Sequence, residues 1–205
     1  MEAIHAAGLA LIYRHGYAAM SLRQLAAEVG LQPGSLYNHI STKQDLLVTL
    51  LQTHMETLLN ALDAAVSPVD PPDSQLRSFV AFHVNYHIAR KQEVFICYSE
   101  LRSLEQGNYE IIVSLRAAYE RRLMIILSRG NAEGAFAVAD IPATTYALLA
   151  MLTGVCTWFN PAGRLSAEEL VGLYTAMALS AVGARPSEPS PVIPASATPV
   201  CAAAR

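Results

Sequence analysis

The sequence predicts an all-α protein with a small N-terminal helical domain and a larger C-terminal helical domain. Apolar residues recur at helical spacing along most of the 205 residues, and alternating strand patterns bounded by turn signals are hard to find. An apolar fraction of 53% is enough for a well-buried core. We therefore expect domains over residues 1–45 and 46–184, followed by a disordered tail over residues 185–205 that is rich in Pro, Ser and Ala.

Three short helices are expected in the N-terminal domain. The first covers residues 2–14 and should end at Gly16, a usual position for a C-terminal glycine cap. Ser21 is a typical N-cap for the second helix. Pro33 is tolerated in a first turn, so it opens a third helix that ends near Ile40.

Two small residues indicate how the second and third of these helices meet. Ala26 lies where two steeply crossing helices would touch, and Gly30 can take the positive φ that lets the chain turn within a few residues. This is the pattern of a helix-turn-helix motif, whose second helix enters the major groove of DNA. A helical hairpin that packs in the same way without any ligand is the alternative.

DNA-binding side chains are expected on the outer surface of this motif, because amides, hydroxyls and imidazoles read base edges or bind phosphate. The candidates are Ser21, Arg23, Gln32, Gly34, Ser35, Tyr37, Asn38, His39 and Lys43. Between residues 14 and 43 there are three basic residues and one acidic residue, in a chain of net charge −3. With so few phosphate contacts available, binding should need two copies of the motif, and hence a homodimer on palindromic double-stranded DNA.

A long helix over residues 42–66 should connect the two domains, and Ser41 with Gln44 has capping-box spacing at its start. The proline-rich stretch SPVDPPD at residues 67–73 should end it. Further helices are expected over residues 74–89, 92–104, 108–129, 143–159 and 167–182.

A ligand pocket is expected in the C-terminal domain, because its helices carry many aromatic residues with polar tips. The effector-binding candidates are Phe82, His83, Tyr86, Tyr98, Arg102, Arg116, Tyr119 and Trp158. An arginine among them could pair with a carboxylate or phosphate on the ligand. Packing in a plain core, or surface salt bridges for the arginines, is the alternative for each of them.

The last two helices are amphipathic and are expected to form the dimer interface as a four-helix bundle with their symmetry mates. The interface candidates are Leu148, Met151, Leu152, Val155, Leu170, Leu173, Tyr174 and Met177.

Several site classes are not expected. Cys97, Cys156 and Cys201 never have C-x-x-C spacing, and His83 with His87 lacks an evident third ligand, so no metal site is expected. No cofactor is expected, and no nucleophile with a neighbouring base can be identified from spacing. No apolar run is expected to reach the roughly 18 residues that span a bilayer, which predicts a cytoplasmic protein without a membrane partner.

The segment from His15 to Leu47 resembles the DNA-binding signature of the TetR family of bacterial transcriptional regulators. The matching residues are Gly16-Tyr17, Ser21, Leu25-Ala26, Gly30, Leu36-Tyr37, His39, Lys43 and Leu46-Leu47. Ile40 departs from the pattern, since an aromatic residue is usual there.

Residues 148–182 are similar to members of that family that sense acyl-CoA thioesters. The matching residues are Gly154, Trp158-Phe159, Pro161, Gly163, Leu165-Ser166 and Glu168-Glu169. The resemblance implies a homodimeric repressor without enzymatic activity, whose operator binding is relieved by a small-molecule effector such as an acyl-CoA thioester. A regulator that senses a neutral hydrophobic compound, a helical interaction protein without DNA binding, and a helical enzyme or carrier are the alternatives.

Overall fold

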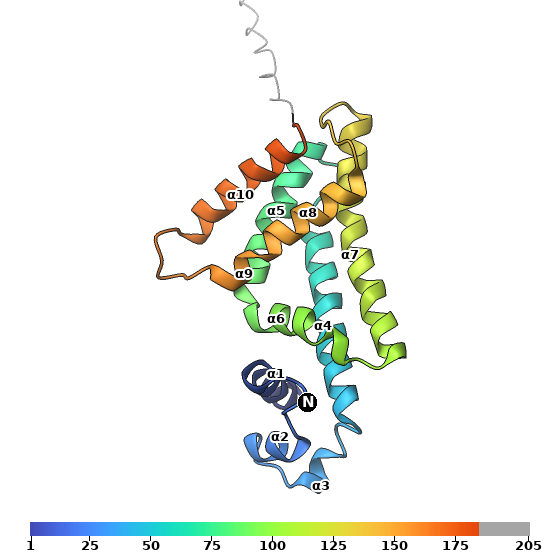
Figure 1. Cartoon of the computed structure of the whole chain (residues 1–205), viewed down its shortest axis with the longest axis vertical. Coiled ribbons are helices and arrows are strands. Elements are labelled where there is room, and N and C mark those ends of the chain that lie inside the picture. The colour runs from blue at the N-terminus through green and yellow to red at the C-terminus, as the bar shows by residue number, and fades with distance from the viewer. Residues whose placement is uncertain (185–205) are drawn as a thin grey trace, which may run out of the picture.

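The computed structural model describes residues 1–184, which form helices and no strand (Figure 1). The elements are α1 (Glu2–His15), α2 (Leu22–Glu28), α3 (Pro33–Leu36), α4 (Lys43–Ala65), α5 (Pro72–Ala89), α6 (Lys91–Ser99), η1 (Leu101–Ser103), α7 (Gln106–Ala132), α8 (Ile141–Thr153), α9 (Val155–Trp158) and α10 (Ala167–Ala181). The all-α prediction is confirmed. The tail expected to be disordered, residues 185–205, lies outside the described residues.

The small N-terminal helices pack as the sequence predicts. Ala26 has no exposed surface, and Leu25 and Leu36 beside it are equally buried. Gly30 has a φ of +68°, which turns the chain between α2 and α3 at no steric cost. Gly16 likewise has a φ of +78° directly after α1. The helix-turn-helix geometry therefore follows from small residues at the crossing and at the turn.

Helix α4 runs without a break from the N-terminal domain into the C-terminal domain (Figure 1). Its start differs from the prediction by one residue. The Thr42 Oγ1 accepts a hydrogen bond from the Asp45 N–H at 3.0 Å, and the Thr42 N–H donates to the Asp45 carboxylate at 2.9 Å. Thr42 is therefore the N-cap in place of Ser41, which leaves the Gln44 side chain available for other contacts.

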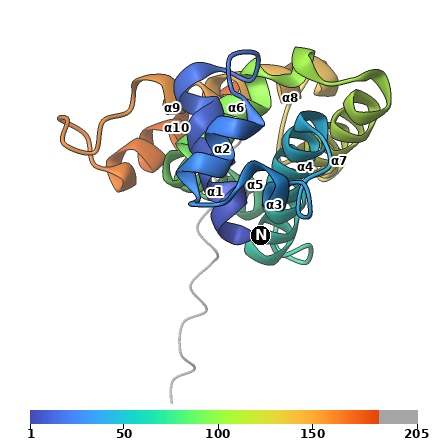
Figure 2. The same cartoon turned by 90° about the horizontal axis from the view of Figure 1, so that it is seen from below.

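Helix α5 is the centre of the C-terminal domain. It packs against α4, α7, α8 and α10, and its residues Leu76, Phe79, Val80 and Val84 have no exposed surface. Seen from below, α1 and α2 lie across the middle of the molecule, with α4 and α7 on one side and α9 and α10 on the other (Figure 2). The N-terminal domain is therefore joined to the rest through α4 and through the contact of α1 with α6.

Two predicted helices are interrupted. The one expected over residues 92–104 ends at Ser99 and resumes as the short helix η1, and the one over residues 143–159 breaks at Gly154 into α8 and α9. The expectation about apolar runs is also wrong, since Ile141–Trp158 is an 18-residue segment of mean hydropathy 1.3. Only 28% of that segment is buried, so α8 and α9 present apolar surface to the outside.

Candidate DNA-binding surface and ligand cavity

The helices α2 and α3, whose segment carries most of the predicted DNA-reading residues, lie at one tip of the molecule, below α1 in Figure 1. Gln32, Gly34, Ser35, Asn38 and His39 are all exposed, and so is Tyr37. The α-helical part of this element ends at Leu36 instead of near Ile40, and residues 37–39 continue as turns.

The turns at the end of α3 keep the backbone compact. The Asn38 N–H donates to the Ser35 carbonyl at 3.2 Å, and the His39 N–H donates to the Leu36 carbonyl at 2.9 Å. Such bonds to the third residue back tighten a helix end. The side chains of residues 37–39 therefore project from a compact turn at the tip.

Two of the other three candidates also have structural contacts. Ser21 caps α2, since its Oγ accepts from the Gln24 N–H at 3.2 Å. Lys43 is half-buried: its Nζ donates to the Ala18 carbonyl at 3.1 Å and lies 4.3 Å from the centre of the Tyr17 ring. Arg23 is exposed. The positive charge near the motif is therefore sparse and partly committed to holding the turn after α1.

Arg14 offers little further charge, because its guanidinium pairs with the Glu28 carboxylate at 3.1 Å. Both side chains are about half exposed, so the pair adds little to stability, but it compensates the charge of Arg14. Binding to phosphate must then depend on few contacts per copy.

A polar junction that the sequence did not reveal ties this domain to the C-terminal domain. The Gln44 amide donates to the Tyr17 hydroxyl at 3.0 Å and to the Ser103 carbonyl at 2.6 Å. Its carbonyl oxygen accepts from the Glu105 N–H at 3.3 Å. Both amide hydrogens and the amide oxygen are therefore used, and they link the turn after α1 and helix α4 to the segment between α6 and α7.

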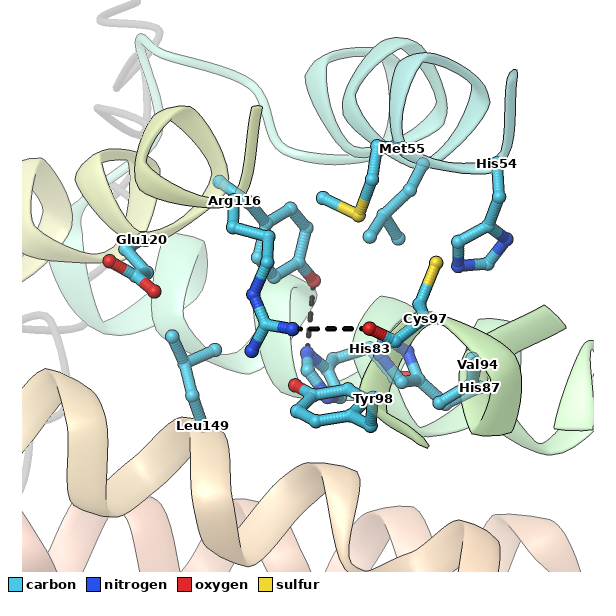
Figure 3. A pocket seen from close by; sticks show the side chains of 12 residues that line it. His54, Met55, His83, His87, Val94, Cys97, Tyr98, Arg116, Glu120 and Leu149 are labelled. Carbon is cyan, nitrogen blue, oxygen red and sulfur yellow. Dashed lines mark hydrogen bonds between the residues drawn. The ribbon is translucent and has the colours of Figure 1, made fainter. Parts of the chain in front are cut away.

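A small cavity, here called the inner chamber, lies between α4, α5, α6, α7 and α8 (Figure 3). It encloses about 40 Å³, which is room for roughly three water molecules. Its walls are formed by His54, Met55, Leu58, His83, His87, Val94, Cys97, Tyr98, Arg116, Tyr119, Glu120 and Leu149.

A chain of hydrogen bonds crosses the wall of the inner chamber and joins four helices. His83 on α5 is bonded through Nδ1 to the Tyr119 hydroxyl at 2.9 Å and through Nε2 to the Thr153 Oγ1 at 3.1 Å. The Tyr98 hydroxyl lies 3.3 Å from the same Thr153 oxygen. Helices α5, α6, α7 and α8 thus share one polar network.

Three buried histidines make the chamber polar without making it charged. The rings of His83 and His87 are stacked, with centres 3.7 Å apart. Burial lowers the pKa of His54 to about 4 and that of His87 to about 3, and it lowers the pKa of His83 well below its usual value. All three imidazoles are therefore neutral near pH 7, because a buried cation would lack solvation.

Arg116 brings a positive charge to the chamber wall. Its guanidinium lies 4.5 Å from the centre of the Tyr98 ring, and its Nη1 donates to the Cys97 carbonyl at 3.4 Å (Figure 3). The ion pairs found in residues 1–184 do not include Arg116. Arg122 on the same helix differs, since it pairs with Asp63 at 3.0 Å. Arg116 can therefore accept an anion without giving up a carboxylate partner.

A larger cleft, here called the outer groove, adjoins the chamber and shares Val94 and Tyr98 with it. It has a volume of about 560 Å³ and runs between α1, α6 and the α8–α9 bend. Lys91 is its charged residue, and Tyr13 of α1 forms part of its wall. The Tyr13 ring meets the Phe95 ring edge-on at 5.3 Å between centres. An occupant of the groove would thus touch the DNA-binding domain directly.

The inner chamber brings together His83, Tyr98, Arg116 and Tyr119 of the predicted effector residues, but four others lie elsewhere. Phe82 and Tyr86 project from another side of α5, where the Arg90 guanidinium lies 4.2 Å from the Tyr86 ring centre. Arg102 lines a shallow open pocket, and Trp158 is 52% exposed on α9. These four therefore do not line the inner chamber, and their role in effector binding stays a prediction.

The dimer-interface candidates differ in exposure, according to the side of the helix on which each residue lies. The residues with 0–2% exposed surface are Leu148, Leu152, Val155 and Leu170. They belong to the protomer's own core, so their prediction as partner contacts is corrected. Met151 and Tyr174 are half-buried, and Leu173 and Met177 are about half exposed.

The exposed side of the same helices forms a second apolar surface, here called the α8–α10 face. Its large apolar members are Tyr146, Trp158, Leu173 and Met177, each 46–53% exposed. This surface explains why so little of Ile141–Trp158 is buried within the chain.

Comparison with known proteins agrees with this two-part arrangement. Residues 4–50 match the bacterial regulatory proteins of the tetR family, and residues 69–182 match the tetracyclin repressor-like C-terminal domain. The HTH-type transcriptional repressor KstR2 of Mycolicibacterium smegmatis is 27% identical over 173 residues, which cover 82% of this chain and 82% of that protein.

Solved structures share the fold. A tetR-family regulatory protein from Rhodococcus RHA1 has a TM-score of 0.85 at 28% identity, covering 90% of this chain and 97% of that one. AibR, in complex with isovaleryl coenzyme A and operator DNA, has a TM-score of 0.80 at 24% identity, covering 86% and 96%. With both of its domains matched, this chain belongs to the TetR family and is a DNA-binding transcriptional regulator.

Proposed function

We propose that the chain is a homodimeric repressor that leaves its palindromic operator when it binds an acyl-CoA thioester. Residues 1–45 bind DNA, and residues 46–184 bind the effector and form the dimer. The protein acts in the cytoplasm and catalyses no reaction. The observation that carries this proposal is Arg116, a partly buried cation of the chamber wall that has no carboxylate partner within residues 1–184 and lies over Tyr98, a residue that the chamber shares with the outer groove.

The two compartments suit the two parts of an acyl-CoA. The inner chamber is the smaller of the two and takes the acyl group, and the outer groove is more than ten times larger and takes part of the coenzyme. Lys91 in the wall of the groove and Arg116 in the wall of the chamber supply positive charge for phosphate or for the thioester carbonyl. AibR, which has the same fold, was solved with isovaleryl coenzyme A, and this supports the proposed ligand class.

The dimer forms through the α8–α10 face. Half-exposed Trp158, Leu173 and Met177 form an apolar surface that a second copy of the chain would cover. The DNA-binding domain alone carries little positive charge, so pairing two domains on one operator also supplies affinity that one copy lacks.

Release of DNA follows from the position of the outer groove. Its walls belong to α1, α6 and the α8–α9 bend, so an occupant changes the separation between Tyr13 of the DNA-binding domain and the helices that carry the dimer face. The ligand then favours a spacing of the two recognition elements that does not fit the operator. This is a shift between two populations, whose size equals the ligand's difference in affinity for them.

A titration of the protein–operator complex tests the proposal. DNA from upstream of the protein's own gene is labelled, and its fluorescence anisotropy is followed while short-chain and medium-chain acyl-CoAs, the free acids, or coenzyme A are added. We expect only the thioesters to release the DNA. Equal release by the free acids or by uncharged hydrophobic compounds would refute the acyl-CoA assignment.

Two matched variants test the role of the cation. Arg116→Gln should weaken release by acyl-CoA about tenfold or more, because a charge-assisted bond is lost. Arg121→Gln removes an exposed guanidinium from the same helix and should release DNA as the wild type does. If acyl-CoA releases operator DNA from Arg116→Gln as readily as from the wild type, the cation is not part of the site.

A further inference from the structure

We propose that the inner chamber recognises a hydroxyl group on a short acyl chain, so that hydroxyacyl thioesters are bound in preference to saturated ones of equal length. This inference rests on the proposed function, which supplies the thioester. It adds the chemical nature of the acyl group to that function.

The first step is the tautomer of His87. Its Nδ1 lies 2.8 Å from the His83 backbone carbonyl, which can only accept a hydrogen bond. Nδ1 must therefore carry the hydrogen. Burial lowers the pKa of His87 to about 3, so the ring is neutral and its Nε2 bears a free lone pair.

The second step is that this lone pair has no protein partner. Within residues 1–184, no hydrogen bond reaches Nε2 of His87, although the side chain is only 3% exposed and lines the chamber. The buried polar side-chain atoms left without a partner there are the hydroxyls of Tyr86, Ser99 and Thr145. Nε2 of His87 has no hydrogen bond and is not one of these fully buried atoms. We therefore infer that it is open to the chamber, where it can accept a hydrogen bond.

The third step adds a group that can both donate and accept. His54 projects from α4 toward Cys97 at the edge of the chamber (Figure 3), and neither of its ring nitrogens bonds to a protein group within residues 1–184. Because burial lowers its pKa to about 4, the ring is neutral and carries one N–H and one lone pair. Between them, His54 and His87 offer both kinds of hydrogen-bonding group.

A hydroxyl complements this pair and a methylene does not. A hydroxyl donates to a lone pair and accepts from an N–H, so it replaces water in the chamber without loss of hydrogen bonds. A saturated chain displaces the same water and leaves both imidazoles unpaired. An acyl group that ends in a free carboxylate would bring negative charge beside Glu120, which also lines the chamber. The volume of about 40 Å³ restricts the acyl group to a few carbon atoms.

The test compares two probes that differ by one oxygen, butyryl-CoA and 3-hydroxybutyryl-CoA. Their dissociation constants for the full-length protein are measured by titration calorimetry. We expect the hydroxylated thioester to bind about 10- to 100-fold more tightly, because it spares buried polar groups from losing their partners. Equal or tighter binding of butyryl-CoA would overturn this inference and leave the proposed function standing. If neither thioester binds, the proposed function itself fails.

Variants locate the effect. His87→Leu removes the lone pair at similar volume and should bring the two dissociation constants to within about threefold, whereas His15→Leu, at an exposed position, should leave their ratio unchanged. A preserved ratio in a folded His87→Leu protein would overturn the assignment.

A spectroscopic readout keeps the inference testable if His87→Leu does not fold. In the wild type, the ¹⁵N resonance of His87 Nε2 should respond differently to the two probes, because 3-hydroxybutyryl-CoA donates a hydrogen bond to this nitrogen and butyryl-CoA leaves it without a partner. The same shift with both probes would overturn the inference. Succinyl-CoA serves as a further probe, and tighter binding of it than of 3-hydroxybutyryl-CoA would also overturn the inference, because the chamber would then read a carboxylate.

Discussion

Mild acid should destabilise the folded chain because three neutral histidines are buried at the centre of the C-terminal domain. The pKa of His54 is lowered to about 4, that of His87 to about 3, and that of His83 well below 6.5, in each case chiefly by burial. The unfolded chain exposes all three and takes up protons first as the pH falls through about 6.5. The contribution of the neutral histidines to the free energy of unfolding is therefore fully present above that pH and is lost as the pH falls below it.

The magnitude follows from the difference in proton binding between the two states. For one histidine with a pKa of about 6.5 when unfolded and about 4 when folded, a change from about pH 7.5 to about pH 5.5 lowers the free energy of unfolding by about 1.4 kcal/mol. His54 and His87 together give about 3 kcal/mol, and His83 acts in the same direction. This is a large part of the roughly 5–15 kcal/mol that stabilises a typical domain.

Urea denaturation followed by circular dichroism at both pH values measures this loss, with the protomer concentration held constant. His54→Gln keeps a polar side chain that does not titrate, so the loss should shrink by about 1.4 kcal/mol. His15→Gln, at an exposed position, should behave as the wild type. An unchanged pH dependence in His54→Gln would refute the reasoning that buried neutral imidazoles cause the effect.

Three further substitutions have defined outcomes. Asn38→Ala should weaken operator binding by about 1–3 kcal/mol in a gel-shift titration if the amide reads a base, and unchanged affinity would remove it from the interface. Met177→Glu should place an unpaired charge in the dimer interface at a cost of about 3–5 kcal/mol, and an intact dimer in sedimentation would move the interface elsewhere. Gly130→Ala would set a methyl group 1.9 Å from the Phe136 ring and should cost about 1–3 kcal/mol in urea denaturation, whereas Gly107→Ala on the same helix meets nothing within 4 Å and should be tolerated.

The N-terminal motif could be predicted because its rules are local. A cap at Ser21, a small residue at the crossing and a glycine at the turn each act within a few residues, and the structure has all three. The start of α4 could not be predicted in this way. Ser41 with Gln44 and Thr42 with Asp45 have the same capping spacing, and in the structure the Gln44 amide bonds to Tyr17 and Ser103 while Thr42 forms the cap.

The ligand cavity was predicted in part, because helical spacing does not fix which face of a helix points inward. The residues four apart on α5, His83 and His87, face the chamber, while Phe82 one position earlier does not. On α8 and α10 both sides are apolar, so sequence cannot separate the protomer's own core from a face left for a partner. His54 was missed because it lies within the apolar pattern of the long connecting helix, where a single imidazole gives little signal.

The Gln44 junction has a consequence for how abruptly the protein responds. Each hydrogen bond at this amide depends steeply on distance and angle, and the bonds share one rigid plane. A tilt of α4 that breaks the contact with Ser103 therefore also strains those with Tyr17 and Glu105. Intermediate tilts lose hydrogen bonds without gaining others. We therefore expect the junction to favour two arrangements, one with its hydrogen bonds formed and one with them broken. If ligand binding tilts α4, we expect each protomer to switch in one step, so that rising ligand concentration changes the fraction of molecules in each position.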